Sequence, residues 1–278
     1  MTDSVTVLAR AKVNLCLHVT GRRPDGYHLL DSLVVFPRLG DLIEAERATQ
    51  TSLTLAGPFG QDLGSDADNL VLRAARLMPG AAALRLEKNL PVASGIGGGS
   101  ADAAAAVRAM AELSGAALPD TTALLGLGAD VPVCLTQQPA RMRGIGDQLD
   151  PLPKLSALWC VLANPRVACP TPPVFQALAR VDNPPLPDLP ARLDAPEDLI
   201  RYLETTRNDL QAPAREICPA IAAVLAALEA TENCQLHRMS GSGATCFGLY
   251  KTEADALIAA DQLRADQPSW WVAAAPLG

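Results

Sequence analysis

The chain has 278 residues, of which 49% are hydrophobic and 19% charged. This composition is typical of a folded globular protein and excludes a disordered one. The formal net charge of −7 excludes the strongly basic surface of a nucleic-acid-binding protein, so no nucleic-acid partner is expected.

The first half predicts a β-rich segment followed by an α/β segment. Strand-forming residues occupy 5–20, 33–36, 42–45, 53–55, 84–86 and 131–135. Apolar residues at helical spacing predict helices over 69–78, 100–114 and 121–127. The helix over 100–114 is the clearest of these, because it is rich in alanine and is closed by Gly115.

The second half predicts the order strand, helices, strand, strand, helix, strand. The predicted strands are 158–163, 235–239, 245–250 and 270–274, and the predicted helices are 171–180, 197–206, 219–231 and 253–265. This order is that of a ferredoxin-like layer with extra helices. With turn residues at 150–153 marking a boundary, we expect an α+β fold of two domains, a mixed α/β domain over 1–152 and a ferredoxin-like domain over 153–278.

Counts and spacings of reactive side chains exclude several enzyme classes. The four lysines are Lys12, Lys88, Lys154 and Lys251, and none follows a glycine, so there is no Walker phosphate loop. The seven cysteines form no Cys-x-x-Cys pair and the three histidines no His-Glu-x-x-His motif, so no clustered zinc site is expected. The scattered cysteines suit reduced thiols. No signal peptide or membrane-span pattern occurs, so we expect a cytoplasmic protein without a membrane partner.

Four glycines within five residues, at 95 and 97–99, stand directly before the clearest predicted helix. Glycine permits a ligand to approach the backbone closely, and the free N–H groups at a helix N-terminus favour a phosphate. The alternative is a flexible turn in which Ser100 or Asp102 acts as an ordinary helix cap. A dinucleotide-binding fingerprint does not fit, because its third glycine would fall on Ser100.

Two other segments invite a functional interpretation and also have ordinary alternatives. The Gly/Ser-rich turn over 239–245 is either a hairpin turn or a second loop bordering the same anion site. Lys12 lies within an apolar strand pattern, which is unfavourable for an ammonium group unless it is paired. A lysine in a strand is usually a solvent-facing or edge residue, so this position alone decides nothing.

These segments together resemble a known family over nearly the whole chain. The resemblance is carried, in chain order, by Lys12 with Asn14, the PDGYH tract 24–28, the Pro91-x-x-x-Gly-x-Gly-Gly-Gly-Ser100 loop, Gly128-Ala-Asp-Val-Pro132 and Ser240-Gly-Ser-Gly-Ala-Thr245. Tracts at 143–147, 170–175 and 208–210 add to it. The chain is similar to the 4-diphosphocytidyl-2-C-methyl-D-erythritol kinases, which belong to the small-molecule kinase superfamily with galactokinase, homoserine kinase and mevalonate kinase.

The resemblance implies transfer of the γ-phosphate of ATP to the 2-hydroxyl of the methylerythritol substrate, in the non-mevalonate route to isoprenoid precursors. It implies ATP as co-substrate, with Mg²⁺ expected, and a small-molecule partner that carries a cytidine diphosphate group. Lys12 and Asp130 match the catalytic pair. The residues that match the ATP-phosphate loop are Pro91, Val92, Ala93, Ser94, Gly95, Ile96, Gly97, Gly98, Gly99, Ser100 and Ala101.

Residues outside this loop match the substrate-binding positions of the family. The matching residues are Asn14, Tyr27, His28, Thr171 and Phe175. Cytosine would lie between the rings of Tyr27 and Phe175 and hydrogen-bond to His28. The turn of Gly241, Ser242 and Gly243 would close the site near the phosphates. The first domain would then hold the ATP loop and the catalytic pair, and the second would be the substrate domain.

The sequence departs from part of the family near the loop. Ala93, Ala101 and Asp102 stand where some relatives have Gly, Ser and Asn, and Asp102 adds a negative charge near the triphosphate. Lys88 is the backup candidate for the role of Lys12. The remaining alternatives are another kinase of the superfamily, of homoserine or mevalonate type, and a non-catalytic nucleotide sensor. The resemblance predicts neither the oligomeric state nor protein ligands for Mg²⁺.

Overall fold

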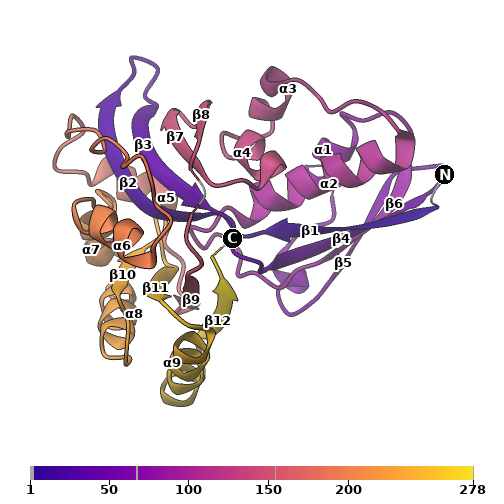
Figure 1. Ribbon diagram of the computed structural model, residues 1–278. Coiled ribbons are helices and arrows are strands. Elements are labelled where there is room, and N and C mark those ends of the chain that lie inside the picture. The colour runs from indigo at the N-terminus through magenta and orange to yellow at the C-terminus, as the bar shows by residue number, and fades with distance from the viewer. Residues whose placement is uncertain (1–2, 67, 154, 278) are drawn as a thin grey trace. The chain divides into compact units, whose positions relative to one another are not determined.

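A computed structural model describes residues 3–66, 68–153 and 155–277, so Lys154 lies outside the described residues. Its backbone contacts divide the chain into two compact units, whose elements are labelled in Figure 1. Unit 1 comprises Met1–Lys12, Leu39–Val92 and Gly97–Gln137, and unit 2 comprises Val13–Arg38, Ala93–Ile96 and Gln138–Gly278. The sequence predicts a single boundary after residue 152. In the structure the chain instead passes between the two units several times.

Unit 1 is a four-stranded sheet with helix α2 packed on it. The strands, in sheet order, are β1 (Ser4–Arg10), β4 (Gly40–Arg47), β6 (Ala82–Glu87) and β5 (Ser52–Ala56), and only the β5–β6 pair is parallel. The helices are η1 (Gly60–Asp62), α1 (Leu70–Ala75), α2 (Gly98–Ser114), α3 (Thr121–Leu125) and α4 (Val131–Thr136). Helix α2 packs on β1 and β4 (Figure 1). Its alanines at 103–106 are fully buried, and their small side chains let the helix lie close to the sheet.

Unit 2 contains two four-stranded antiparallel sheets. The first consists, in sheet order, of β2 (Val13–Arg22), β3 (His28–Val35), β7 (Ala140–Gly144) and β8 (Gln148–Pro151). The second consists of β10 (Leu236–Met239), β11 (Cys246–Tyr250), β9 (Trp159–Asn164) and β12 (Trp271–Pro276). The helices are α5 (Thr171–Gln176), α6 (Pro196–Glu204), α7 (Gln211–Ile217), α8 (Ala220–Glu229) and α9 (Glu253–Asp266).

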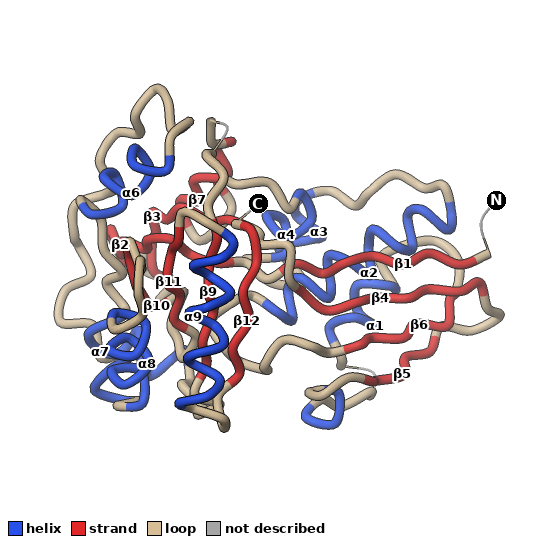
Figure 2. The backbone as a smooth tube through the Cα atoms, turned by 60° about the horizontal axis from the view of Figure 1, so that its bottom comes forward, coloured by secondary structure: helices blue, strands red, loops and turns tan. Residues whose placement is uncertain are grey.

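The second sheet of unit 2 confirms the predicted ferredoxin-like layer. Its strands alternate with α8 and α9 in a βαββαβ order, and the first strand, β9, lies in the interior of the sheet. Helix α8 packs on β10 and β11, and α9 packs on β9 and β12 (Figure 2). Within the described ranges, no helix combines the length and the apolar character that a membrane span needs. All seven cysteines are free thiols.

Two local predictions differ from the structure. The strand predicted over 5–20 is broken at Ala11 and Lys12, because β1 and β2 join different sheets. The strand predicted over 131–135 is helix α4: Pro132 occupies the first turn, where a missing N–H costs nothing, and a short apolar run does not by itself separate a strand from a helix. Strands β7 and β8 and helix α7 were not predicted.

The predicted domain boundary differs for a related reason. Strand β3 pairs with β7 through residues more than one hundred positions later in the chain, from Leu30 with Gly144 to Val34 with Ala140. That ladder places the β2–β3 hairpin in unit 2. Local sequence patterns contain no information about such a long-range pairing.

Candidate active site

Lys12 and Asp130 form an ion pair within unit 1. Lys12 lies in the break after β1, and its Nζ donates to Asp130 Oδ2 at 2.7 Å. Asp130 directly precedes α4 but makes no side-chain cap bond with that helix. The Lys12 side chain is only 6% exposed, whereas that of Asp130 is 30% exposed. The pairing explains a buried ammonium, and the open carboxylate could accept a proton from a bound hydroxyl.

The Gly-rich loop forms the N-terminus of α2, which begins at Gly98, two residues earlier than predicted. Gly97 precedes the helix with a φ of 63°, and the stem of Lys12 lies against it. The first intrahelical bond runs from the N–H of Ala101 to the carbonyl of Gly97 at 2.9 Å. The N–H groups of Gly98, Gly99 and Ser100 therefore have no acceptor within the helix, and the space beside Gly99 is open. This is the geometry of an anion-binding helix end.

The tract that contains Asp130 lies beside the same helix end. A Cβ built on Gly128 would be 3.8 Å from Ser100 Oγ. Unit 1 thus brings together the Lys12–Asp130 pair, the first residues of α2 and the tract 128–132. Not every predicted ATP-binding residue is exposed, because Pro91, Ser94, Ile96 and Ala101 are buried.

The earlier part of the loop, Ser94 and Gly95, belongs to unit 2 and lies against the second Gly-rich turn. Ser240 Oγ donates to Gly95 O at 3.0 Å, and Thr245 N donates to Ser94 O at 3.1 Å. A Cβ on Gly95 would stand 2.6 Å from the carbonyl of Gly243. The two Gly/Ser loops are therefore neighbours, and Gly95 has no room for a side chain.

His28 and Phe175 form an aromatic pair in unit 2. Their ring centroids are 4.8 Å apart with an interplanar angle of 30°. Tyr27 is 61% exposed. Burial, with a smaller contribution from Arg22, lowers the pKa of His28, so its imidazole is neutral at pH 7. A neutral imidazole both donates and accepts a hydrogen bond, which suits the edge of a nucleobase.

Asn14 and Thr171 are held by other residues of unit 2. Asn14 Nδ2 donates to Ser32 Oγ at 2.7 Å, while Asn14 Oδ1 is buried without a hydrogen-bond partner among the described residues. Thr171, at the start of α5, lies 2.7 Å from Ser242 through the two hydroxyl oxygens. Each of the two residues is linked to the 240–243 segment, since Asn14 N donates to Ser240 Oγ at 3.1 Å.

Lys88, the backup candidate, is enclosed in the interior of unit 1. It is 2% exposed, and its Nζ donates to Asp41 Oδ2 at 2.5 Å and to Asp102 Oδ2 at 2.7 Å. Lys88 therefore faces two carboxylates and not a bound phosphate, and the negative charge expected from Asp102 near the triphosphate instead faces Lys88. Sequence reasoning missed Asp41, although a carboxylate beside the apolar residues of a strand is a signal of a buried partner.

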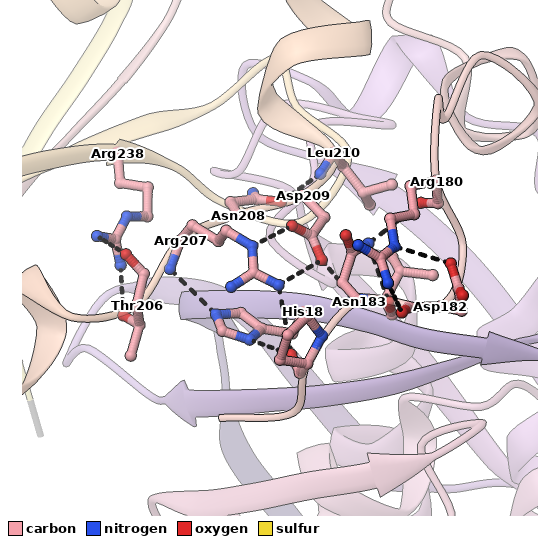
Figure 3. Close-up of polar contacts among 12 residues, drawn as sticks. His18, Arg180, Asp182, Asn183, Thr206, Arg207, Asn208, Asp209, Leu210 and Arg238 are labelled. Carbon is pink, nitrogen blue, oxygen red and sulfur yellow. Dashed lines mark hydrogen bonds and ion pairs between the residues drawn. The ribbon is translucent and has the colours of Figure 1, made fainter. Parts of the chain in front are cut away.

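The Pro-rich loop over 182–196 is anchored to β2 of unit 2 (Figure 3). His18 Nδ1 lies 3.0 Å from Pro184 O, and the N–H of Arg207 donates to His18 Nε2 at 3.2 Å. Asn183 N donates to Val19 O at 3.1 Å.

Side chains that could hold a metal ion are not grouped in the described ranges, where no set of three or more His, Cys, Asp or Glu residues meets that requirement. Asp130 pairs with Lys12, and Asp41 and Asp102 pair with Lys88. The donors at the loop are instead backbone N–H groups and the Ser100 hydroxyl, which suit a phosphate.

Comparisons with known proteins identify the family of the chain. Residues 69–148 match the model of the GHMP kinases N terminal domain, and residues 191–268 match that of the GHMP kinases C terminal. Homoserine kinase from Cytophaga hutchinsonii shares the fold, with a TM-score of 0.66 at 18% identity over 100% of this chain and 95% of that one. The two family models, on a fold shared with such enzymes, define a small-molecule kinase of the GHMP class.

Relatives of higher sequence identity point to one family within this class of kinases. The chain is 58% identical over 269 residues to 4-diphosphocytidyl-2-C-methyl-D-erythritol kinase from Cereibacter sphaeroides (96% of this chain, 97% of the relative). It is 55% identical over 270 residues to the protein of that name from Paracoccus denitrificans (97% and 95%). A crystal structure of 4-(cytidine 5'-diphospho)-2C-methyl-D-erythritol kinase superimposes with a TM-score of 0.81 at 35% identity, covering 99% of each chain. The chain belongs to this kinase family.

Proposed function

We propose that the protein is an ATP-dependent kinase that phosphorylates the 2-hydroxyl of 4-diphosphocytidyl-2-C-methyl-D-erythritol in the non-mevalonate route to isoprenoid precursors. The observation that carries the proposal is the Lys12–Asp130 pair beside an open, glycine-built helix N-terminus. The names of the relatives supply the substrate. A phosphotransferase needs both a place for phosphate and a group that manages the proton of the attacking hydroxyl.

Asp130 would accept the proton of the substrate hydroxyl or orient that hydroxyl for attack. Lys12 is the hydrogen-bond donor that fixes the Asp130 carboxylate, at 2.7 Å. The nucleotide supplies the phosphoryl group, and the N–H groups of Gly98, Gly99 and Ser100 would hold its phosphates through backbone dipoles. This arrangement binds an anion without adding to net charge, which fits a chain of charge −7.

Unit 2 would recognise the cytidine part of the substrate. The rings of His28 and Phe175, together with the exposed ring of Tyr27, offer stacking surfaces and a neutral imidazole. The unpartnered Asn14 Oδ1 is an acceptor suited to a hydroxyl donor, and Thr171 and the turn of Gly241, Ser242 and Gly243 complete this set. In the protein itself the Phe175 ring also lies beside the His28 ring, with the centroids 4.8 Å apart.

Mg²⁺ belongs to the same proposal as the ion that accompanies ATP. Magnesium keeps several waters and is commonly bound through substrate phosphates and one or two carboxylates. The acidic residues near the loop already pair with lysines, so the Ser100 hydroxyl and the nucleotide's phosphates fit better than a carboxylate cage. The seven free thiols suit a reducing compartment, and we place the enzyme in the cytoplasm.

A coupled assay of ADP release tests the proposal. The purified protein should consume ATP when the cytidyl-methylerythritol substrate is present, and ³¹P NMR should show a phosphomonoester on the 2-hydroxyl. Homoserine and mevalonate serve as matched alternative substrates, and calorimetry with CDP tests the cytidine site separately. Turnover of homoserine or mevalonate without CDP binding would replace the proposal by another kinase of the superfamily. ATP binding without turnover of any of the three would favour a nucleotide sensor.

A further inference from the structure

A buried ion cluster in unit 1 lies beneath the phosphate-binding end of α2. Asp41 is the second residue of β4, Lys88 directly follows β6, and Asp102 lies in the second turn of α2. All three side chains are at most 3% exposed. The proposed catalytic steps use none of them.

The cluster holds both ends of the Gly-rich loop. Asp41 Oδ1 accepts the backbone N–H groups of Asn89 at 2.5 Å and Leu90 at 2.8 Å, where the chain leaves β6 and enters the loop. At the other end, Lys88 Nζ donates to Asp102 Oδ2 at 2.7 Å. The same ammonium lies against the first residue of the helix, since a Cβ on Gly98 would stand 3.1 Å from Lys88 Nζ.

The charge of the cluster depends on one proton. Burial raises the pKa of Asp102 to about 8; the Lys88 ammonium opposes this rise and the Asp41 carboxylate adds to it. Burial lowers the pKa of Lys88, but the two carboxylates outweigh that effect and raise it above its ordinary value. With Lys88 charged and Asp102 protonated, the cluster carries no net charge at pH 7. Deprotonation of Asp102 leaves one negative charge beneath a phosphate site.

Other charged groups near α2 face different partners. The titratable groups that face Asp102 are Asp41, Lys88 and the buried thiol of Cys134 on α4. Burial raises the pKa of that thiol, so it is neutral at pH 7 to 9. Arg10 on β1 faces Arg108 further along α2, and Arg73 on α1 donates to the carbonyl at the end of α3. Asp102 is thus the group of the cluster whose charge changes between pH 7 and 9.

We propose that Asp41, Lys88 and Asp102 are positioning residues that hold the ATP-phosphate loop in its binding conformation and, with one ammonium between two carboxylates, limit the negative charge beside the phosphates. The inference rests on the proposed function, because it takes the phosphates of ATP as the ligand of this helix end. Asp102 Oδ1 is buried and makes no hydrogen bond with any described residue, which costs folding free energy. Packing alone therefore does not explain a carboxyl group at this position.

The test compares D102N with D102A. Asparagine keeps an oxygen that accepts from Lys88 and cannot ionise, whereas alanine removes the link between Lys88 and α2. We expect the dissociation constant of ATP, measured by calorimetry at pH 7, to rise by roughly tenfold in D102A and to change by less than about threefold in D102N. The dissociation constant of CDP should not change in either variant. D31N, which weakens a buried ion pair with Arg141 in unit 2, is the control for a general loss of stability.

The pH profile provides a second readout that packing would not affect. The KM for ATP of the unmodified protein should rise by roughly fivefold from pH 7 to pH 9, because the new charge repels phosphate, and it should stay flat in D102N. Equal pH profiles in the two proteins, or equal ATP affinity in D102A and D102N, would overturn the proposal. So would an equal loss of ATP and CDP affinity in D102A.

Hydrogen exchange without any nucleotide separates this proposal from the proposed function. Amides of residues 89–101 should exchange faster in D102A than in D102N, while those of β9 and β11 should be unchanged. That result supports the positioning role even if the unmodified protein fails to phosphorylate the cytidyl substrate. Unchanged exchange of residues 89–101 in D102A contradicts the positioning role, whatever the enzyme's activity.

Discussion

The stem of Lys12 lies directly against Gly97, so that a Cβ built on Gly97 would stand 3.1 Å from Lys12 Cβ. Gly97 also has a φ of 63°, in the left-handed region that side chains disfavour. One glycine thereby sets both the start of α2 and the position of the lysine that binds Asp130. The phosphate loop and the proposed catalytic pair are coupled through this contact.

Replacing Gly97 by alanine should therefore damage catalysis more than folding. The left-handed backbone costs a non-glycine residue about 1–2 kcal/mol, which urea unfolding would detect. Displacement of Lys12 or of the helix start should lower kcat by roughly 10²-fold, because small misplacements of catalytic groups have large effects.

Gly80→Ala is the matched control for this substitution. Gly80 also has a positive φ, of 90°, but a Cβ at this position would meet no neighbouring atom within 4 Å. G80A should lose a similar amount of stability and keep its kcat. If G97A keeps kcat as well, the Lys12–Gly97 contact has no part in catalysis.

Asp130→Asn should remove turnover while leaving ATP bound. The amide oxygen can still accept from Lys12, so the local geometry is retained, but the amide cannot take a proton. The loss of one general base or orienting group lowers kcat by roughly 10²–10⁴-fold. Steady-state kinetics and calorimetry with ATP measure the two effects separately.

Asp150→Asn provides the comparison for D130N. Asp150 pairs with Arg143 at 2.7 Å on the surface of unit 2, where ion pairs contribute little. D150N should behave like the unmodified protein. A D130N enzyme with near-normal kcat would exclude Asp130 from the mechanism.

The parts of the fold that depend on local pattern could be predicted from the sequence. Strands such as β4 and β6 and the alanine-rich α2 follow from apolar spacing and from glycine at helix ends. The ferredoxin-like layer followed from the order of its elements. The four clustered glycines before a helix predicted either a phosphate loop or a capped turn, and the family resemblance favoured the first.

The remaining parts depend on contacts between distant residues. Asp41 reaches Lys88 across 47 positions, and no local pattern relates them. Lys12 was expected inside a strand, but the chain breaks there to enter another sheet. The role of Asp102 could not be inferred either, because an aspartate in a first or second helical turn is usually a favourable surface residue.

Phe175→Ala should weaken binding of the cytidyl substrate without slowing its phosphorylation. The Phe175 ring packs 4.8 Å from the His28 ring and offers a face for the base. Aromatic pairs contribute about 0.5–1.5 kcal/mol beyond the area they bury, so KM for this substrate should rise by roughly threefold to tenfold. The KM for ATP should not change. Phe175→Leu, which keeps an apolar side chain without the ring, should show most of the same loss.

Tyr27→Ala tests the second stacking surface with little risk to the fold. Because Tyr27 is 61% exposed, its removal should leave the melting temperature within about 2 °C. KM for the cytidyl substrate should rise by a factor similar to that of F175A, and kcat should be retained. If Y27A leaves KM unchanged while F175A raises it, the base stacks on one face only.

Protonation of His18 should lower the free energy of unfolding in mild acid. Burial is the main cause that lowers its pKa, and the Arg207 charge adds to this effect while Pro184 O opposes it (Figure 3). In the neutral ring Nε2 accepts the N–H of Arg207, and a proton on Nε2 would remove that bond. The unfolded chain, with an ordinary histidine pKa near 6.5, binds the proton more readily than the folded one. The stabilisation is therefore complete above about pH 6.5 and is lost as the pH falls toward the folded-state pKa.

Urea unfolding at pH 7.5 and 5.5 should show a smaller acid-dependent loss of stability in His18→Gln than in the unmodified protein. Equal losses would mean that other groups cause the acid sensitivity.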